Sequence, residues 1–278
     1  MILRCGPRDL DLDERVRLMG VLNVTPDSFS DGGRFIDVSQ AVGRALEMVV
    51  EGADIIDVGG ESTRPGAEPV DEQVEMGRVI PVIEELRSRS DVFISIDTSK
   101  AAVADAACAA GADIVNDVTA LRGDDAMRDL VADRGAGLVL MHMQGDPRTM
   151  QTTPTYDDVI VEVSAFLTEA ARSAEDAGIK RDSIVIDPGI GFGKTVEHNL
   201  SLIRSIDRFV ETGYPVLVGP SRKTFIGKVL DVDVGERVEG TAAVCVWCVS
   251  RGVRLLRVHD VQAIHRAVRM TEALMGPP

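Results

Sequence analysis

The sequence is poor in aromatic residues, which make up 4% of its 278 residues and include a single Trp. Its apolar content, 45% of the chain, is therefore mostly aliphatic. Aliphatic strands and Ala-rich helices suit the layers of an α/β fold better than a β-sandwich. The length falls within the range of one α/β barrel, so we expect a single domain over residues 1–278.

Lysine is also scarce, and most of the positive charge is Arg. The formal net charge is −15. An acidic surface of this kind argues against nucleic acid and anionic membranes as partners. It does not exclude an anionic substrate, because a few local Arg and Lys side chains can form a positive pocket.

The sequence lacks a signal-peptide pattern and any apolar run of 18 residues, so we expect a cytoplasmic protein with reduced thiols. Cys245 and Cys248 have the spacing of a zinc or redox motif. They lie in an apolar helical segment, however, and no second pair follows at ligand distance. A buried structural pair is therefore the favoured interpretation.

Eight short apolar segments each end at a polar or glycine-containing stop, and a helical pattern follows each of them. Parallel strands of a barrel bring all their C-terminal ends to one face, where active sites are built. Helical patterns are predicted at 39–52, 71–89, 100–110, 124–134, 156–177, 197–212, 236–251 and 261–274. Several of these end at a glycine suited to a left-handed helix end, namely Gly52, Gly111, Gly135, Gly178, Gly213 and Gly252.

An open, doubly wound sheet would show the same alternation. It usually carries phosphate-binding glycines after its first strand, whereas residues 25–33 here are long and polar, with no helix start. The pattern therefore favours an α/β fold of the (β/α)8 TIM barrel type. Residues 2–5 and 10–12 are expected to form a short N-terminal hairpin that closes the bottom of the barrel.

The sequence does not match several common catalytic motifs. The run Pro188-Gly189-Ile190-Gly191-Phe192-Gly193-Lys194-Thr195 has Pro at the first required glycine of a P-loop and is one residue short of a dinucleotide fingerprint. Position 223 is Lys, so residues 219–223 do not form a nucleophile elbow. No His-Glu-x-x-His motif is present. Nucleotide binding, covalent serine chemistry and zinc catalysis are therefore disfavoured.

What remains is a set of hydrogen-bond acceptors and cations at strand ends. Asp97, Asn116 and Asp187 end three strands and can bond the amino and ring N–H donors of a flat heterocycle. Lys223 can donate to the carbonyl of that ring. The phosphate-binding candidates are Arg64, Arg257 and His259, and Asn23 is a candidate oxygen ligand for Mg²⁺.

These segments, in this order, closely resemble the dihydropteroate synthase family over residues 18–274. Two of the matching segments are long and highly specific, covering residues 19–33 and 57–66. The shorter ones gain weight from their order and spacing. They are Ser95-Ile96-Asp97-Thr98, Asn116-Asp117, Met141-His142-Met143-Gln144-Gly145, Asp187 to Lys194, Ser221-Arg222-Lys223 and Arg257-Val258-His259-Asp260.

The resemblance implies one pterin-binding barrel domain over residues 1–278. Such a transferase joins 6-hydroxymethyl-7,8-dihydropterin diphosphate to 4-aminobenzoate in folate biosynthesis and releases pyrophosphate and 7,8-dihydropteroate. It also implies a homodimer, an Mg²⁺ ion at Asn23 and inhibition by sulfonamides. No nucleic acid or membrane is implied as a partner.

The resemblance also assigns roles to residues by position. The pterin is expected at Asp97, Asn116, Asp187 and Lys223. The diphosphate is expected at Arg64, Arg257 and His259, beside Thr63. The aminobenzoate site is expected between Thr63, Pro65, Phe192, Lys223 and Ser221, with Phe29 nearby. Arg64, Lys223, Arg257 and His259 are the expected catalytic residues.

Two other functions stay open at this point. One is a pterin-binding methyltransferase that passes a methyl group from methyltetrahydrofolate to a corrinoid. The other is a catalytically silent paralogue that binds pterin. The first needs neither residues 221–223 nor the 62–66 loop, and the intact cationic set argues against the second. The effect of Pro220, next to Ser221, is left undecided.

Overall fold

The core of the protein is a sheet of eight parallel strands. The computed structural model describes residues 1–25, 38–62, 66–145 and 149–276. Neighbouring strands follow the order β8-β7-β6-β5-β4-β3-β10-β9. The strands are β3 (Arg17–Asn23), β4 (Ile55–Gly59), β5 (Phe93–Asp97), β6 (Ile114–Asp117), β7 (Gly137–Met141), β8 (Ile184–Asp187), β9 (Leu217–Val218) and β10 (Leu255–Val258).

The two edge strands of this order meet, so the sheet closes into a barrel. Ile186 of β8 pairs in parallel with Val216, and its N–H donates to the Pro215 carbonyl at 2.9 Å. β9 has only two residues, and prolines stand at 215 and 220 on either side of it. Proline has no N–H for a strand ladder, which limits the length of this strand. The predicted (β/α)8 barrel is confirmed.

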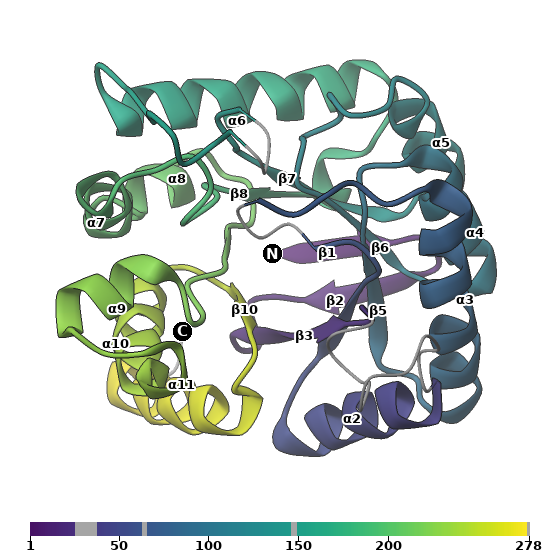
Figure 1. Cartoon of the computed structure of the whole chain (residues 1–278), viewed down its shortest axis with the longest axis horizontal. Coiled ribbons are helices and arrows are strands. Elements are labelled where there is room, and N and C mark those ends of the chain that lie inside the picture. Colours follow the sequence, from purple (N-terminus) through teal and green to yellow (C-terminus); the bar gives the residue numbers. More distant parts are fainter. Residues whose placement is uncertain (26–37, 63–65, 146–148, 277–278) are drawn as a thin grey trace.

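The helices surround the strands, nearly in chain order (Figure 1). They are α2 (Val38–Glu51), α3 (Glu72–Arg89), α4 (Ala101–Ala110), α5 (Met127–Arg134), α6 (Val159–Asp176), α7 (Val196–Arg204), α8 (Asp207–Val210), α9 (Thr224–Leu230), α10 (Val238–Val249) and α11 (Val261–Met275), with 3₁₀ turns η1 (Arg181–Ser183) and η2 (Val234–Glu236). The glycines expected after helices all have positive φ angles: Gly52, Gly111, Gly135, Gly178, Gly213 and Gly252.

The structure differs from the predicted helices at three places. The helix expected at 197–212 is divided into α7 and α8, because the chain leaves helical geometry at Ser205, where φ is −108° and ψ is 29°. The helix expected from residue 124 begins at Met127, since the Asp124 carboxylate accepts the N–H groups of Ala101 and Ala126 instead. The short helix α9 was not predicted at all.

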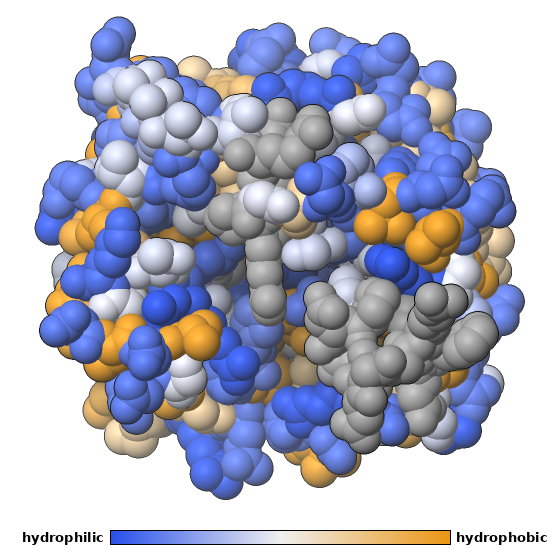
Figure 2. Space-filling view, in the orientation of Figure 1, coloured by the Kyte–Doolittle hydropathy of each residue, from blue (hydrophilic) through white to orange (hydrophobic). Residues whose placement is uncertain are grey.

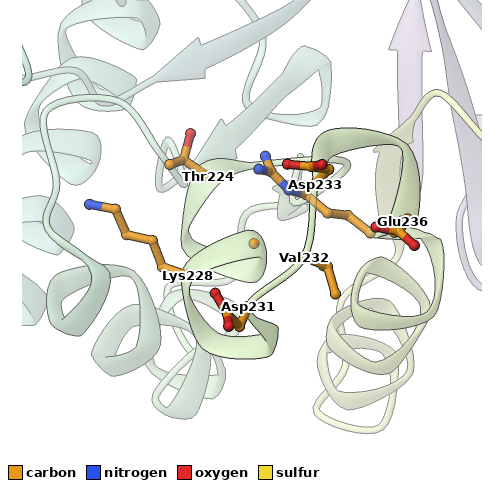
Figure 3. A pocket seen from close by; sticks show the side chains of 8 residues that line it. Thr224, Lys228, Asp231, Val232, Asp233 and Glu236 are labelled. Carbon is orange, nitrogen blue, oxygen red and sulfur yellow. The ribbon is translucent and has the colours of Figure 1, made fainter.

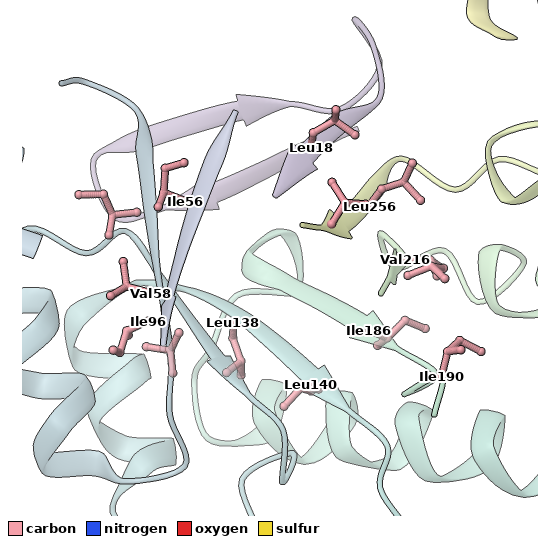
Figure 4. Packing of buried hydrophobic residues seen from close by; sticks show 14 of the residues in the cluster. Leu18, Ile56, Val58, Ile96, Leu138, Leu140, Ile186, Ile190, Val216 and Leu256 are labelled. Atoms are coloured by element: carbon pink, nitrogen blue, oxygen red, sulfur yellow. The ribbon is translucent and has the colours of Figure 1, made fainter. Parts of the chain in front are cut away.

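The main core lies between the barrel and its ring of helices. Alternate strand residues face outward there and pack against apolar helix faces (Figure 4). Burying one such aliphatic side chain contributes about 1.5–3 kcal/mol. Every side chain labelled in Figure 4 is at most 2% exposed, and they are Leu18, Ile56, Val58, Ile96, Leu138, Leu140, Ile186, Ile190, Val216 and Leu256.

The predicted N-terminal hairpin is present. β1 (Ile2–Cys5) pairs antiparallel with β2 (Arg8–Asp11). Its buried side chains and Leu12 pack on apolar residues that the strands point into the barrel, well below the strand C-termini. This second cluster comprises Leu3, Cys5, Leu10, Leu12, Met19, Ile55, Ile114, Val139, Val185, Leu217 and Leu255. The bottom of the barrel is thus sealed with apolar side chains, which leaves the opposite mouth for polar chemistry.

The surface in Figure 2 is largely hydrophilic, in keeping with the charge of the chain. Within the described ranges, no helix has the length and apolar character needed to cross a bilayer. Cys245 and Cys248 lie one turn apart in α10, fully buried, with free thiols. The prediction of a buried structural pair is confirmed for these two cysteines.

Candidate active site

The polar residues of the mouth come from neighbouring strands in matched register. Gly59 of β4 stands opposite Asp97 of β5, and Asp97 stands opposite Asn116 of β6. Asp187 ends β8, and Arg257 lies in β10. Asp97, Asn116 and Asp187 are only 4–7% exposed. The structure therefore places these three predicted residues together at one end of the barrel.

A network of ion pairs joins three of the strands. Arg257 donates from Nε to Asp57 and from Nη2 to Asp97, both at 2.6 Å. Asn116 donates from Nδ2 to the same Asp57 oxygen at 3.1 Å. Burial opposes the charge on Arg257, but Asp57 and Asp97 outweigh that effect and hold the Arg257 pKa above its usual value. The cation is thus fixed between two carboxylates.

Asp57 is the main residue that the sequence prediction missed. Its side chain is 0% exposed and lies between Ile56 and Val58 in the middle of β4, below the mouth. The prediction looked for function at strand ends. A usable signal was present nonetheless, because an acidic residue inside an otherwise apolar strand needs a buried partner.

Burial shifts the pKa values of the acceptors upward. It raises the pKa of Asp97 to about 7, opposed by Arg257 and reinforced by Asp57. It raises the pKa of Asp187 to about 6, opposed by the Gly189 N–H, which donates to Asp187 at 2.7 Å, and by Lys223. Both carboxyls thus titrate near neutral pH, where a ligand with N–H donors would favour their ionised forms.

Lys223 faces this acidic set from the loop after β9. Burial and the nearby Arg257 lower its pKa to about 8. Its Nζ lies 4.0 Å from the centre of the Phe192 ring, a cation–π contact. A Cβ at Gly191 would stand 2.9 Å from the Lys223 Cδ, so the glycine makes room for the lysine. Two predicted residues, Lys223 and Phe192, therefore meet directly.

The glycine run at 189–193 packs against the protein itself. A Cβ at Gly189 would lie 1.9 Å from the His142 carbonyl oxygen, and φ is +67° at this position. Cβ atoms at Gly191 and Gly193 would likewise meet Lys223 and Gln144, so these glycines allow close packing within the protein.

Lys194 was quoted in a motif but given no role. It is 3% exposed, and its Nζ donates to the carbonyls of Phe192 at 2.9 Å and His142 at 3.3 Å. Burial lowers the pKa of Lys194 to about 7 and that of His142 to about 3. This lysine therefore ties the Phe192 loop to the end of β7.

His259 and Ser221 form a second pair at the rim. The Ser221 oxygen accepts the His259 backbone N–H at 3.1 Å and lies 3.0 Å from Nδ1. Burial, aided by Arg257, lowers the pKa of His259 to about 4, so the ring is neutral near pH 7. We assign the Ser221 hydroxyl as donor to Nδ1, which leaves the ring proton on Nε2 for an external acceptor.

Pro220 has a defined place beside this pair. Its carbonyl accepts the Lys223 N–H at 3.3 Å, which closes a tight turn, and Arg222 within that turn has a φ of +57°. Arg222 donates from Nε to Asp260 at 2.9 Å. Pro220 thus starts the turn that presents Ser221 and Lys223.

A separate hollow of about 370 Å³ lies between α9 and η2 (Figure 3). Its lining mixes carboxylates with the cations Lys228 and Arg237, and it includes none of the predicted site residues. Arg237 nevertheless donates to the Arg222 carbonyl at 3.0 Å. The hollow therefore borders the turn without being part of the mouth.

Some predicted residues lie outside the described part of the chain, namely Phe29, Thr63, Arg64 and Pro65. Asn23 is described and ends β3, and its Oδ1 faces Gly59. A Cβ placed at Gly59 would be 3.9 Å from that oxygen and 3.8 Å from Asp97 Oδ2. Asn23 and Asp97 thus both border Gly59 at the mouth.

Comparison with known proteins identifies the family. A model of pterin binding enzymes matches residues 19–259. The dihydropteroate synthase of Haemophilus influenzae is 46% identical over 257 residues, which are 92% of this chain and 93% of that protein. The chain belongs to the dihydropteroate synthase family.

Solved members of the dihydropteroate synthase family have the same fold. A Yersinia pestis structure, a sulfonamide drug complex, superimposes with a TM-score of 0.93 at 42% identity, covering 99% of each chain. A Xanthomonas albilineans structure with 4-aminobenzoic acid gives 0.93 at 47%, covering 100% of this chain and 99% of that one. Another, in complex with 7,8-dihydropteroate, gives 0.90 at 44%, covering 100% of both chains. The family resemblance drawn from the motifs is confirmed.

Proposed function

We propose that the barrel mouth condenses 6-hydroxymethyl-7,8-dihydropterin diphosphate with 4-aminobenzoate, which yields 7,8-dihydropteroate and pyrophosphate in folate biosynthesis. The chain is a transferase of the dihydropteroate synthase family. The observation that carries the proposal is the convergence of buried acceptors with Arg257 and Lys223 at one end of the barrel.

The acceptors suit the pterin, and the cations suit its diphosphate. We assign Asp97, Asn116, Asp187 and Lys223 to the heterocycle. Arg257 and His259 contact the diphosphate, together with Arg64 and Thr63, which lie outside the described residues. Phe192, Lys223 and Ser221 border the aminobenzoate, and the same role is proposed for Phe29 and Pro65, also outside that part.

The chemistry needs little acid–base help. The attacking group is an aromatic amine, which is already neutral near pH 7. Its nitrogen forms a bond to the pterin methylene as the carbon–oxygen bond to pyrophosphate breaks, and the amine then gives up a proton. Charge develops on the departing pyrophosphate, where the guanidinium of Arg257 and the Nε2–H of His259 stabilise it. Losing one such preorganised donor costs about 3 kcal/mol of transition-state stabilisation.

We also propose that Asn23 holds Mg²⁺. The residue fits, because Asn23 offers an amide oxygen at the end of β3, and Mg²⁺ prefers hard oxygen ligands. The described residues contain no cluster of three or more His, Cys, Asp or Glu that would form a complete protein site. Mg²⁺ often takes one or two protein oxygens and completes its shell with water and substrate phosphates. When bound, it would neutralise charge on the diphosphate.

Three further proposals concern context. A homodimer is proposed through the outer helices, because α9, α10 and α11 each carry exposed apolar side chains (Val229, Leu230, Trp247, Met270 and Leu274). Light scattering of Met270→Glu against the wild type tests it.

A cytoplasmic location is proposed from the four free thiols and is tested by cell fractionation. One domain over residues 1–278 stays a prediction that limited proteolysis tests.

One assay separates this function from its rivals. Purified protein is given pterin diphosphate, 4-aminobenzoate and Mg²⁺, and pyrophosphate release is measured with each substrate omitted in turn. The proposal expects release only with both substrates. A methyltransferase would instead need methyltetrahydrofolate and a corrinoid, and a silent paralogue would release nothing. A sulfonamide is expected to compete with 4-aminobenzoate and not with pterin diphosphate.

A further inference from the structure

Asp57 links two groups of the proposed pterin site without reaching the mouth itself. Its carboxylate is completely buried, and one oxygen, Oδ2, accepts from both Arg257 and Asn116. The other oxygen, Oδ1, makes no hydrogen bond to any described residue. A buried carboxylate costs several kcal/mol unless partners compensate it. The contacts to Arg257 and Asn116 supply that compensation.

Arg257 has a second carboxylate partner of a different kind. Asp97, which it contacts at 2.6 Å, lies at the end of β5 and retains 7% exposure, whereas Asp57 has none. Only Asp97 is therefore open to an incoming ligand. A pterin that donates N–H groups to Asp97 competes directly with Arg257 for that carboxylate.

We propose that Asp57 is a positioning residue, which keeps Arg257 in place while the contact between Arg257 and Asp97 is exchanged for contacts with the pterin diphosphate. Asp97 is then released to accept pterin N–H donors, and the Nη groups of Arg257 turn to diphosphate oxygens. Arg257 always retains one carboxylate partner. This inference rests on the proposed function for the identity of the ligand.

Without the charge of Asp57, Arg257 would depend on Asp97 alone. The two would pair more tightly, and the pterin would have to break that pair to bind. Asp57→Asn tests this, because Asn has the same size and keeps one acceptor oxygen. We expect isothermal titration to show about 10- to 100-fold weaker binding of pterin diphosphate, the range for a lost hydrogen bond to a charged group, with a smaller change in kcat.

A pH profile adds a readout that a purely structural role would not move. Four charged groups act on Asp97. They are Arg257 on β10, Asp57 on β4, Glu75 on α3 and Asp117 on β6. Of these groups, Asp57→Asn changes only one, and Asp57 raises the pKa of Asp97. The acid limb of kcat/KM should therefore move to lower pH in the variant.

Ser95→Ala is the matched control. Ser95 stands opposite Asp57 in the β4–β5 register, is 0% exposed, and its hydroxyl has no hydrogen bond within the described residues. This variant should bind and turn over like the wild type. If Ser95→Ala weakened pterin diphosphate binding as much as Asp57→Asn, any substitution at this depth of the barrel would have that effect. That result would overturn the role of Asp57.

The Arg257→Lys background tests whether Asp57 acts through Arg257. There, adding Asp57→Asn should weaken pterin diphosphate binding less than about threefold. The reason is that lysine lacks the guanidinium that bridges Asp57 and Asp97, so the interaction is already lost. An undiminished effect would contradict the proposal. Melting curves accompany each variant, and Asp57→Ser, which should show the same pattern, replaces Asp57→Asn if the latter does not fold.

Different results would contradict the proposed function and the positioning role of Asp57. A wild-type protein that makes no 7,8-dihydropteroate from both substrates contradicts the proposed function. A wild-type protein that makes it, but whose Asp57→Asn variant binds pterin diphosphate normally, contradicts only the positioning role.

Discussion

The ammonium group of Lys223 lies 4.0 Å from the centre of the Phe192 ring. These residues come from different loops, after β9 and β8, and Lys194 holds the Phe192 loop by its carbonyl. The pair forms one wall of the mouth, with a cation that the ring orients. This wall is where we place the boundary between the pterin and aminobenzoate sites.

Phe192→Leu removes the aromatic face but keeps an apolar side chain. A cation–π contact contributes about 0.5–2 kcal/mol, so we expect KM for 4-aminobenzoate to rise roughly 2- to 30-fold. KM for pterin diphosphate should change less. Steady-state kinetics with each substrate varied in turn checks this. An unchanged KM for 4-aminobenzoate would remove Phe192 from that site.

The pH dependence of kcat/KM for pterin diphosphate should be bell-shaped. Asp187, with a pKa of about 6, and Asp97, with a pKa of about 7, must be ionised to accept N–H donors, so activity falls below those values. Lys223, with a pKa of about 8, must be protonated to donate, so activity falls above it.

Lys223→Arg separates the limbs, because Arg stays protonated throughout this range. The basic limb should disappear and the acid limb should remain. Binding of the pterin alcohol without its diphosphate serves as the control for titration of the substrate phosphate. A basic limb that survives Lys223→Arg would rule out Lys223 as its source.

Asp187→Asn should stabilise the protein while it harms function. The folded pKa of Asp187, about 6, lies above the ordinary value of 3.8, so its contribution to stability is fully present below pH 3.8 and is lost as pH rises through 6. Ionised Asp187 therefore destabilises the fold at pH 7.5, by on the order of 3 kcal/mol. Urea unfolding should show Asp187→Asn as the more stable protein at pH 7.5, with the difference vanishing near pH 4. Equal stabilities at pH 7.5 would contradict the raised pKa.

Gly189→Ala should be among the most damaging small substitutions in the chain. The new Cβ would lie 1.9 Å from the His142 carbonyl oxygen, and the positive φ adds strain. We expect a loss of more than about 3 kcal/mol in the free energy of unfolding.

Gly178→Ala is the control, because φ there is +96° and no atom lies within 4 Å of the new Cβ. It should cost about 1 kcal/mol. Equal losses would mean that His142 simply moves aside.

The fold could be predicted from the sequence because its signals are local and repeated. Apolar strands end at polar residues such as Asn116 and Asp187, and glycines close the helices, so the barrel and the acceptors at its mouth followed from the pattern. The helix α9 was missed because its seven residues are too short to show a period.

The missed site residues share a different cause. Asp57 and Lys194 act through partners that are distant in sequence, at Arg257 and His142. No spacing rule reports such a pair. The effect of Pro220 could not be predicted for the same reason. The turn that it begins presents Ser221, whose contact with His259 joins residues distant in sequence.

The most direct measurement compares wild type and Asp187→Asn for formation of 7,8-dihydropteroate from pterin diphosphate and 4-aminobenzoate, with product and pyrophosphate both quantified. The account predicts equal amounts of the two products from the wild type. It predicts a loss of at least about 100-fold in kcat/KM for the variant, the size expected when a buried charged partner of the substrate is removed. Near-normal turnover by a folded Asp187→Asn protein, or a wild type that forms no 7,8-dihydropteroate, would contradict it.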